Sequence, residues 1–181
     1  MLPPLIVHRL ATMISFTDSP DHQQAFRLTA VFEVPYSVEN VFPFFADAGN
    51  LEAITPPWLR FRIDTPLPII MKKGALIDYR LRLHGIPIRW QTEIADWNPP
   101  HSFVDQQLKG PYRLWKHTHT FEPTTNGTNV VDNVDYIVPG GRLVHRLFVR
   151  PDLRKIFTWR QQQISKHFSH DSPAPATSRA R

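Results

Sequence analysis

Four polar side chains able to exchange protons or bind cations lie at alternating positions in the second half of the chain. His117 and His119 are two residues apart in the segment 114–122, and Asp132 and Tyr136 are four residues apart in the segment 129–138. Alternate residues of a β-strand project from the same face. Two imidazoles, a carboxylate and a phenol on adjacent strands can act as general acids and bases or can orient a bound molecule.

A fifth polar residue, Arg160, lies in the C-terminal segment 151–168. Apolar residues recur there at steps of three and four, which predicts an amphipathic helix. The residues of this apolar stripe are Leu153, Ile156, Phe157, Ile164 and Phe168. Arg160 falls in the middle of the stripe, and a buried cation requires a partner. We expect that partner among Asp132, His117 and His119.

The remaining segments predict the sheet that positions these residues. Alternating apolar and polar residues indicate half-buried strands, and clusters of Pro and Gly separate them. The predicted strands are 25–34, 58–63, 74–84, 88–94, 102–108, 114–122 and 129–138, with short helices at 37–45 and 47–55 and a helical lead-in at 142–149. This order predicts an α+β fold: a strongly curved antiparallel sheet of about six or seven strands around one long C-terminal helix, with two short helices after the first strand.

A helix laid in a bent sheet does not fill the sheet's concave face, so a cavity with aromatic walls is expected. Tyr79 and Trp90 face inward on their predicted strands, and Trp115 shares a face with the two histidines. Inward aromatic residues are more often core than ligand contacts, although a cavity combines the two roles. The predicted ligand-binding residues are Tyr79, Trp90, Trp115, His117, His119, Asp132, Tyr136 and Arg160, and the catalytic candidates among them are His117, His119 and Asp132.

Length and composition set the domain organisation. The 181 residues fit one domain, over 25–170, with a flexible N-terminal arm at 1–24 and a disordered tail at 171–181. The N-terminus lacks the positive region of a secretory signal, and the natural start is either Met1 or Met13. We therefore expect a cytoplasmic protein.

Charge and cysteine content exclude several classes of function. The chain has no cysteine, which rules out disulfides and thiolate chemistry. Its net charge of +5 comes from basic residues spread along the chain, so no nucleic-acid partner is predicted. No apolar run is long enough for an integral membrane segment. We predict no cofactor, and the sequence does not identify a protein partner.

Several segments resemble the START-like, birch-pollen-allergen-like helix-grip superfamily known as SRPBCC. They are FEVPYSVENVFPFFADAGNLEAITPPWLRF, GPYRLWKHTHTFEP, VDNVDYIVPGG and FTWRQQQISKHF. The resemblance covers about residues 25–170 and points to a bacterial subgroup of stand-alone ligand-binding domains, similar also to domains beside sugar-epimerase-like modules in proteins named cell-division inhibitors. It implies a helix-grip fold with a cavity for a hydrophobic ligand. Related branches include polyketide cyclases, coenzyme Q-binding proteins, lipid-transfer proteins and plant hormone-binding proteins.

Four interpretations of the polar residues remain open. They can form an internally satisfied network with Arg160 paired to Asp132, or they can recognise polar groups of an otherwise apolar ligand. They can also catalyse cyclisation or dehydration of a poly-β-ketone. The fourth, a metal site of His117, His119 and Asp132, has no further support in the sequence, so no metal is predicted. We predict the binding of a small hydrophobic or amphipathic ligand, such as a lipid, an isoprenoid or an aromatic polyketide; the alternative is an enzyme of the polyketide cyclase or dehydratase type that uses the same cavity.

Overall fold

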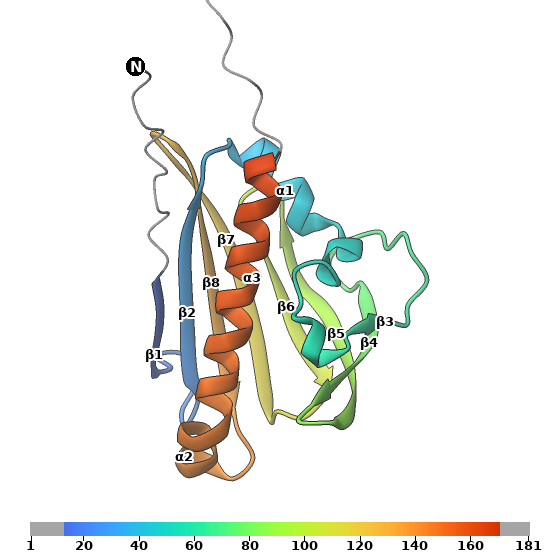
Figure 1. The fold of residues 1–181 in the computed structure, drawn as a ribbon, viewed down its shortest axis with the longest axis vertical. Coiled ribbons are helices and arrows are strands. Elements are labelled where there is room, and N and C mark those ends of the chain that lie inside the picture. The colour runs from blue at the N-terminus through green and yellow to red at the C-terminus, as the bar shows by residue number, and fades with distance from the viewer. Residues whose placement is uncertain (1–12, 171–181) are drawn as a thin grey trace, which may run out of the picture.

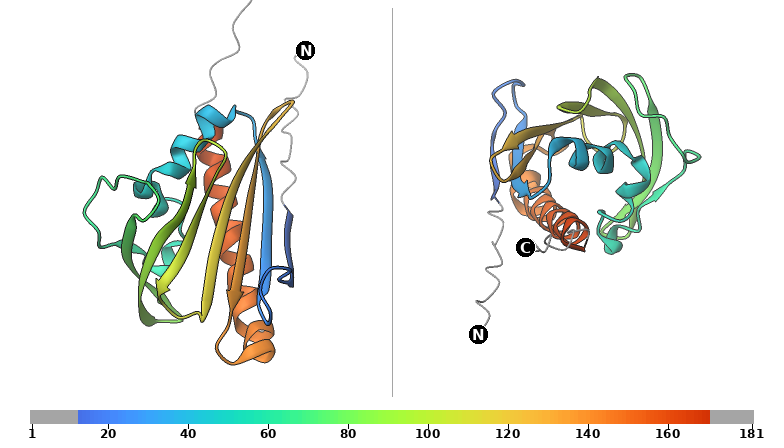
Figure 2. Two further views of the ribbon diagram at one scale, coloured as in Figure 1. Left: turned by 180° about the vertical axis from the view of Figure 1, so that it is seen from behind. Right: turned by 90° about the horizontal axis from the view of Figure 1, so that it is seen from above.

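One curved antiparallel sheet surrounds a long helix (Figures 1 and 2). The computed structural model describes residues 13–170. The strands are β1 (Met13–Asp18), β2 (Phe26–Val34), β3 (Arg62–Ile63), β4 (Leu76–Leu83), β5 (Ile86–Asn98), β6 (Ser102–Lys109), β7 (Leu114–Thr124) and β8 (Gly127–Ile137). They lie in the order β1-β2-β8-β7-β6-β5-β4-β3, and α3 (Arg150–His170) runs along their concave face. The predicted α+β helix-grip fold is confirmed.

Short helical segments cover the two ends of the sheet. Between β2 and β3 lie α1 (Val38–Ala46) and the 3₁₀ turns η1 (Ala48–Leu51) and η2 (Pro57–Leu59). Seen from above, they cross one end of the curved sheet (Figure 2). At the other end, α2 (Gly141–Val144) and the π-helical turn η3 (His145–Val149) lead directly into α3. None of the described helices combines the length and the apolar character needed to cross a membrane.

The structure corrects the prediction at the sheet edges. The sheet has eight strands rather than six or seven, because Met13–Asp18, placed by the sequence in the arm 1–24, pairs with β2 as β1. Of the predicted strand 58–63, only Arg62 and Ile63 pair with β4, since consecutive prolines before it start the turn η2. Of the predicted helix 47–55, only the 3₁₀ turn η1 is present, and the residues after it form an irregular turn and a bend. The remainder of the arm, 1–12, and the tail 171–181 lie outside the described residues.

The core of the described residues contains three apolar clusters, and a polar layer separates the two larger ones. Near α1, the larger cluster contains Phe121 of β7, Val130 of β8 and Ile164 of α3. Near α2, the second contains Leu28, Val134, Tyr136, Leu153 and Phe157. Between them the same three elements place His117 and His119 on β7, Asp132 on β8 and Arg160 on α3. Polar residues thus interrupt the apolar pattern of β7, β8 and α3 at the same level, between the two larger apolar clusters.

Candidate functional site

A cavity of about 190 Å³ lies between α3 and the part of the sheet formed by β4 to β7. Helix α3 packs against β2 and β8 through Leu153 and Phe157, whereas β4 and β5 curve away from it (Figure 2). Most residues around the cavity are apolar, and many are aromatic. The aromatic residues of the lining are Phe44, Phe45, Phe61, Tyr79, Trp90, Phe103, Tyr112, Trp115 and Phe157.

Two polar tips of the aromatic wall are already satisfied within the protein. The Trp90 Nε1–H donates to Thr92 Oγ1 over 3.1 Å, and the Tyr79 hydroxyl lies 3.2 Å from the same oxygen. Burial raises the pKa of Tyr79, so this phenol stays protonated. Tyr79 and Trp90 therefore offer aromatic faces rather than polar groups to a molecule in the cavity.

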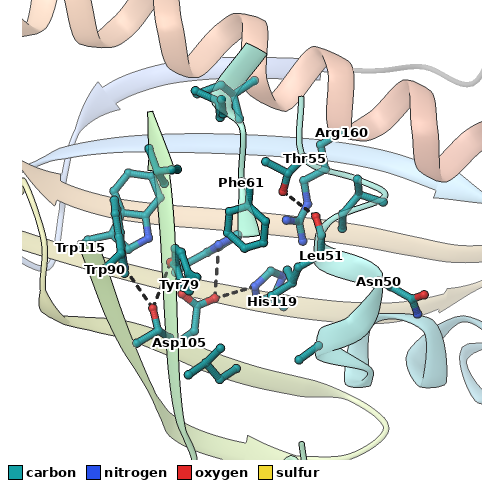
Figure 3. A pocket seen from close by; sticks show the side chains of 18 of the residues that line it. Asn50, Leu51, Thr55, Phe61, Tyr79, Trp90, Asp105, Trp115, His119 and Arg160 are labelled. Carbon is teal, nitrogen blue, oxygen red and sulfur yellow. Dashed lines mark hydrogen bonds and ion pairs between the residues drawn. The ribbon is translucent and has the colours of Figure 1, made fainter. Parts of the chain in front are cut away.

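Polar groups gather on one side of the cavity (Figure 3). We call Asp105, His117, His119 and Asp132 the histidine–aspartate cluster. His117 Nε2 lies 3.0 Å from Asp132 Oδ1, and His119 Nε2 lies 3.0 Å from Asp105 Oδ2. The second nitrogens also face carboxylates: His119 Nδ1 is 2.8 Å from Asp132 Oδ1, and His117 Nδ1 is 3.5 Å from Asp105 Oδ2. Each carboxylate therefore faces both imidazoles.

These contacts decide the charge of the cluster. Burial opposes ionisation of Asp132, but the hydrogen bonds and charges of the two histidines hold its pKa well below the usual value. Burial likewise opposes charging of His119, yet its contacts with Asp105 and Asp132 raise its pKa. Burial and the neighbouring imidazole lower the pKa of His117. The contacts therefore favour the ionised form of Asp132, the protonated form of His119 and the neutral form of His117.

Arg160 of α3 lines the cavity beside this cluster. Its Nε is 3.9 Å from Asp132 Oδ2, and within residues 13–170 neither atom has a hydrogen-bond partner. This separation allows an ion pair without a hydrogen bond. Its side chain is 13% exposed. Arg160 is therefore balanced in charge by Asp132 but retains donor capacity for a molecule in the cavity.

Six of the eight predicted ligand-binding residues line the cavity: Tyr79, Trp90, Trp115, His117, His119 and Arg160. Asp132 does not, because the two imidazoles lie between its fully buried carboxylate and the cavity. Tyr136 does not either, because it points into the apolar cluster near α2, where its hydroxyl lies 2.9 Å from His145 Nε2. A direct ligand contact is therefore unsupported for Asp132 and Tyr136.

Asp105, a cavity-lining residue of β6, was not among the residues predicted from the sequence. It alternates in phase with Phe103, which is buried. A carboxylate in the same phase as a core aromatic residue was a usable signal, because it places a charge on the inner face. Asp105 supplies the second carboxylate of the histidine–aspartate cluster.

His145, at the start of η3, forms a separate polar contact with Tyr136. Its ring stacks on Phe26 with centroids 3.6 Å apart, and burial lowers its pKa, assisted by Arg150 and Arg142 and opposed by Asp18. The folded state therefore prefers the neutral imidazole more strongly than the unfolded chain does.

The sign of the resulting pH dependence follows from this lowered pKa. His145 contributes stability that is complete above the unfolded pKa of about 6.5 and is lost as the pH falls toward the folded pKa. We expect His145→Gln to reduce the loss of unfolding free energy between about pH 7.5 and pH 5. Urea unfolding of both proteins at the two pH values measures this difference, and an equal loss in both would contradict it.

Comparison with known proteins identifies a matching family and solved structures with the same fold. A family model described as "Polyketide cyclase / dehydrase and lipid transport" matches residues 34–164. None of the curated proteins matches the sequence.

Solved structures with low sequence identity share the fold. Protein Ms6760 from Mycobacterium smegmatis is 16% identical with a TM-score of 0.64, over 88% of this chain and 100% of that chain. Major latex-like protein 151 from Panax ginseng is 12% identical with a TM-score of 0.59, over 82% and 99%. CalU16 from Micromonospora echinospora is 12% identical with a TM-score of 0.56, over 91% and 88%.

Proposed function

Because the chain belongs to the polyketide cyclase/dehydrase and lipid transport family, a branch of the SRPBCC superfamily that its sequence resembles, we propose that it binds a small amphipathic molecule in the cavity beside α3. One observation carries this proposal: an apolar, aromatic-walled cavity has its charged groups on one side. Ligand sites typically combine such walls with a few convergent polar groups.

The shape of the cavity favours a compact ligand. A volume of about 190 Å³ suits a medium-chain acid, a short isoprenoid or a fused aromatic ring system better than a two-chain lipid. The stacked rings of Tyr79 and Trp90, with centroids 5.8 Å apart, offer a surface for a planar or aliphatic body. A carboxylate, hydroxyl or carbonyl oxygen of the ligand then faces the Arg160 guanidinium.

Ligand-dependent stability tests this proposal. The purified protein is melted with decanoic acid, geraniol or 2-naphthol, which represent the lipid, isoprenoid and aromatic classes. A probe at one hundred times its Kd adds about 2.7 kcal/mol of stability, which raises the Tm by roughly 5–10 °C for a chain of this size. Mass spectrometry of molecules that co-purify with the protein extends the search beyond these probes. The proposal fails if no probe shifts the Tm and the purified protein carries no small molecule.

The second candidate function is a cyclase or dehydratase acting on a poly-β-ketone. The observation that favours it is the pair of imidazoles at the cavity wall, with ring centroids 3.7 Å apart. A ring nitrogen can remove the proton next to one ketone, and the resulting carbanion adds to a second carbonyl carbon of the same molecule. The oxygen of that carbonyl takes a proton from a neighbouring N–H, and the aldol addition closes a ring. Replacing His117 or His119 singly should then abolish conversion in variants that keep the far-ultraviolet circular dichroism of the native protein, whereas unchanged turnover would exclude these roles.

We also propose a cytoplasmic location.

A further inference from the structure

The histidine–aspartate cluster has the donor set and layout of a transition-metal site. One donor atom from each of Asp105, His117 and His119 lies within 4.8 Å of the others. These residues come from adjacent strands, β6 and β7, and all three line the cavity. Two histidines and one carboxylate with open positions form the ligand set of zinc and non-haem iron(II) sites. We propose that Asp105, His117 and His119 bind a divalent transition-metal ion of this class.

The two distances from Asp105 to the histidine nitrogens match the spacing of metal ligands. Ligands about 2.0–2.2 Å from a metal lie about 2.8–3.5 Å from one another, from octahedral to tetrahedral geometry. Asp105 Oδ2 is 3.0 Å from His119 Nε2 and 3.5 Å from His117 Nδ1. The ion therefore replaces the proton between His119 and Asp105 and needs only a small separation of these side chains.

A second carboxylate supports both imidazoles from behind. The nitrogen that faces away from the proposed ion is 3.0 Å from Asp132 Oδ1 in His117 and 2.8 Å in His119. Histidine ligands of metals regularly donate their other N–H to a carboxylate, which fixes the tautomer and orients the ring. Asp132 performs this task for two ligands with one oxygen, which explains why a fully buried carboxylate interrupts the apolar face of β8. Among the described residues His119 Nδ1 has no hydrogen-bond partner despite this short distance, and a small rotation of the ring on metal binding would supply one.

A carboxylate and an imidazole nitrogen face each other at the cavity wall. His117 Nδ1 and Asp105 Oδ2 are 3.5 Å apart. The space between two such donor atoms is a position that favours a cation. Arg160 does not occupy it, because its contact is with Asp132 Oδ2 on the other side of the imidazoles.

The open coordination positions of the ion would face the cavity. All three ligands line the cavity, and Figure 3 shows Asp105 and His119 near its aromatic side chains. A carbonyl, enol or carboxylate oxygen of a bound molecule could complete the coordination. The bound ion would thus anchor the ligand, although the proposed ligand-binding function does not require it.

Cobalt(II) absorption and zinc calorimetry test the site directly. The full chain is stripped with a chelator, dialysed and titrated with Co²⁺ and, separately, with Zn²⁺. We expect a visible ligand-field spectrum and saturation at one ion per chain. Asp105→Asn should remove the ligand-field spectrum, and Asp132→Asn should weaken zinc binding about 10- to 100-fold.

The matched control is His84→Ala. His84 and Asp152 form an exposed histidine–carboxylate pair, with Nε2 and Oδ2 2.6 Å apart. This variant should keep the stoichiometry and spectrum of the wild type, because the pair lies outside the cluster. A wild-type protein without a ligand-field spectrum overturns the proposal whatever the variants do, and so does equal binding by wild type and Asp105→Asn. Melting the metal-free protein with the three organic probes tests ligand binding separately, so the two proposals can fail independently.

Discussion

Replacing Asp132 with alanine should lower the free energy of unfolding by about 3–5 kcal/mol. The carboxylate is fully buried and faces His117, His119 and Arg160. Its removal leaves two imidazoles and a guanidinium in the interior without their shared counter-ion. Breaking a buried charge network from one side has this cost because the remaining groups cannot recover their hydration.

Urea unfolding with linear extrapolation measures the effect of Asp132→Ala. The matched control is Asp96→Ala on β5, where a 58% exposed carboxylate lies 3.6 Å from Lys73. This exposed pair should contribute about 0.5 kcal/mol or less. A loss below about 1 kcal/mol for Asp132→Ala would contradict the role of this carboxylate as the shared counter-ion of the buried network.

Filling the cavity should abolish ligand binding while the fold persists. Leu51, in η1, lines the cavity from the end covered by α1 (Figure 3). Tryptophan at this position extends an indole into the space that the ligand would occupy. We expect Leu51→Trp to raise the Kd of the best-binding probe at least about 100-fold, which corresponds to roughly 2.7 kcal/mol.

The control for this variant is Leu143→Trp. Leu143 is 68% exposed on α2 and lies outside the cavity lining. It should bind the probe as the wild type does, and both variants should retain the far-ultraviolet circular dichroism of the native protein. Wild-type affinity in Leu51→Trp would place the binding site elsewhere.

The sequence predicted most of the fold because the inner strands alternate cleanly. In β7 the buried positions are His117, His119 and Phe121, in the phase that the sequence indicated. The edge strands are less predictable. β1 is short and none of its residues is buried, and β3 shrinks to two residues because the prolines before it favour a turn.

The candidate site was only partly predictable, because alternation gives the face of a residue but not its position along that face. Tyr136 and Asp132 share the inner face of β8 with Val134, yet the cavity does not extend to either of them. Asp105 was missed although its phase is that of buried Phe103. The spacing between Arg160 and Asp132 depends on how α3 crosses the sheet, which no local pattern encodes.

The most direct measurement of the central proposal is a crystal structure of the protein with its best-binding probe. We predict the apolar body of the probe against Tyr79 and Trp90 and its oxygen within hydrogen-bonding distance of Arg160 or the cavity-facing histidines. A probe bound only on the outer surface, with the cavity closed by its own side chains, would contradict the proposed function.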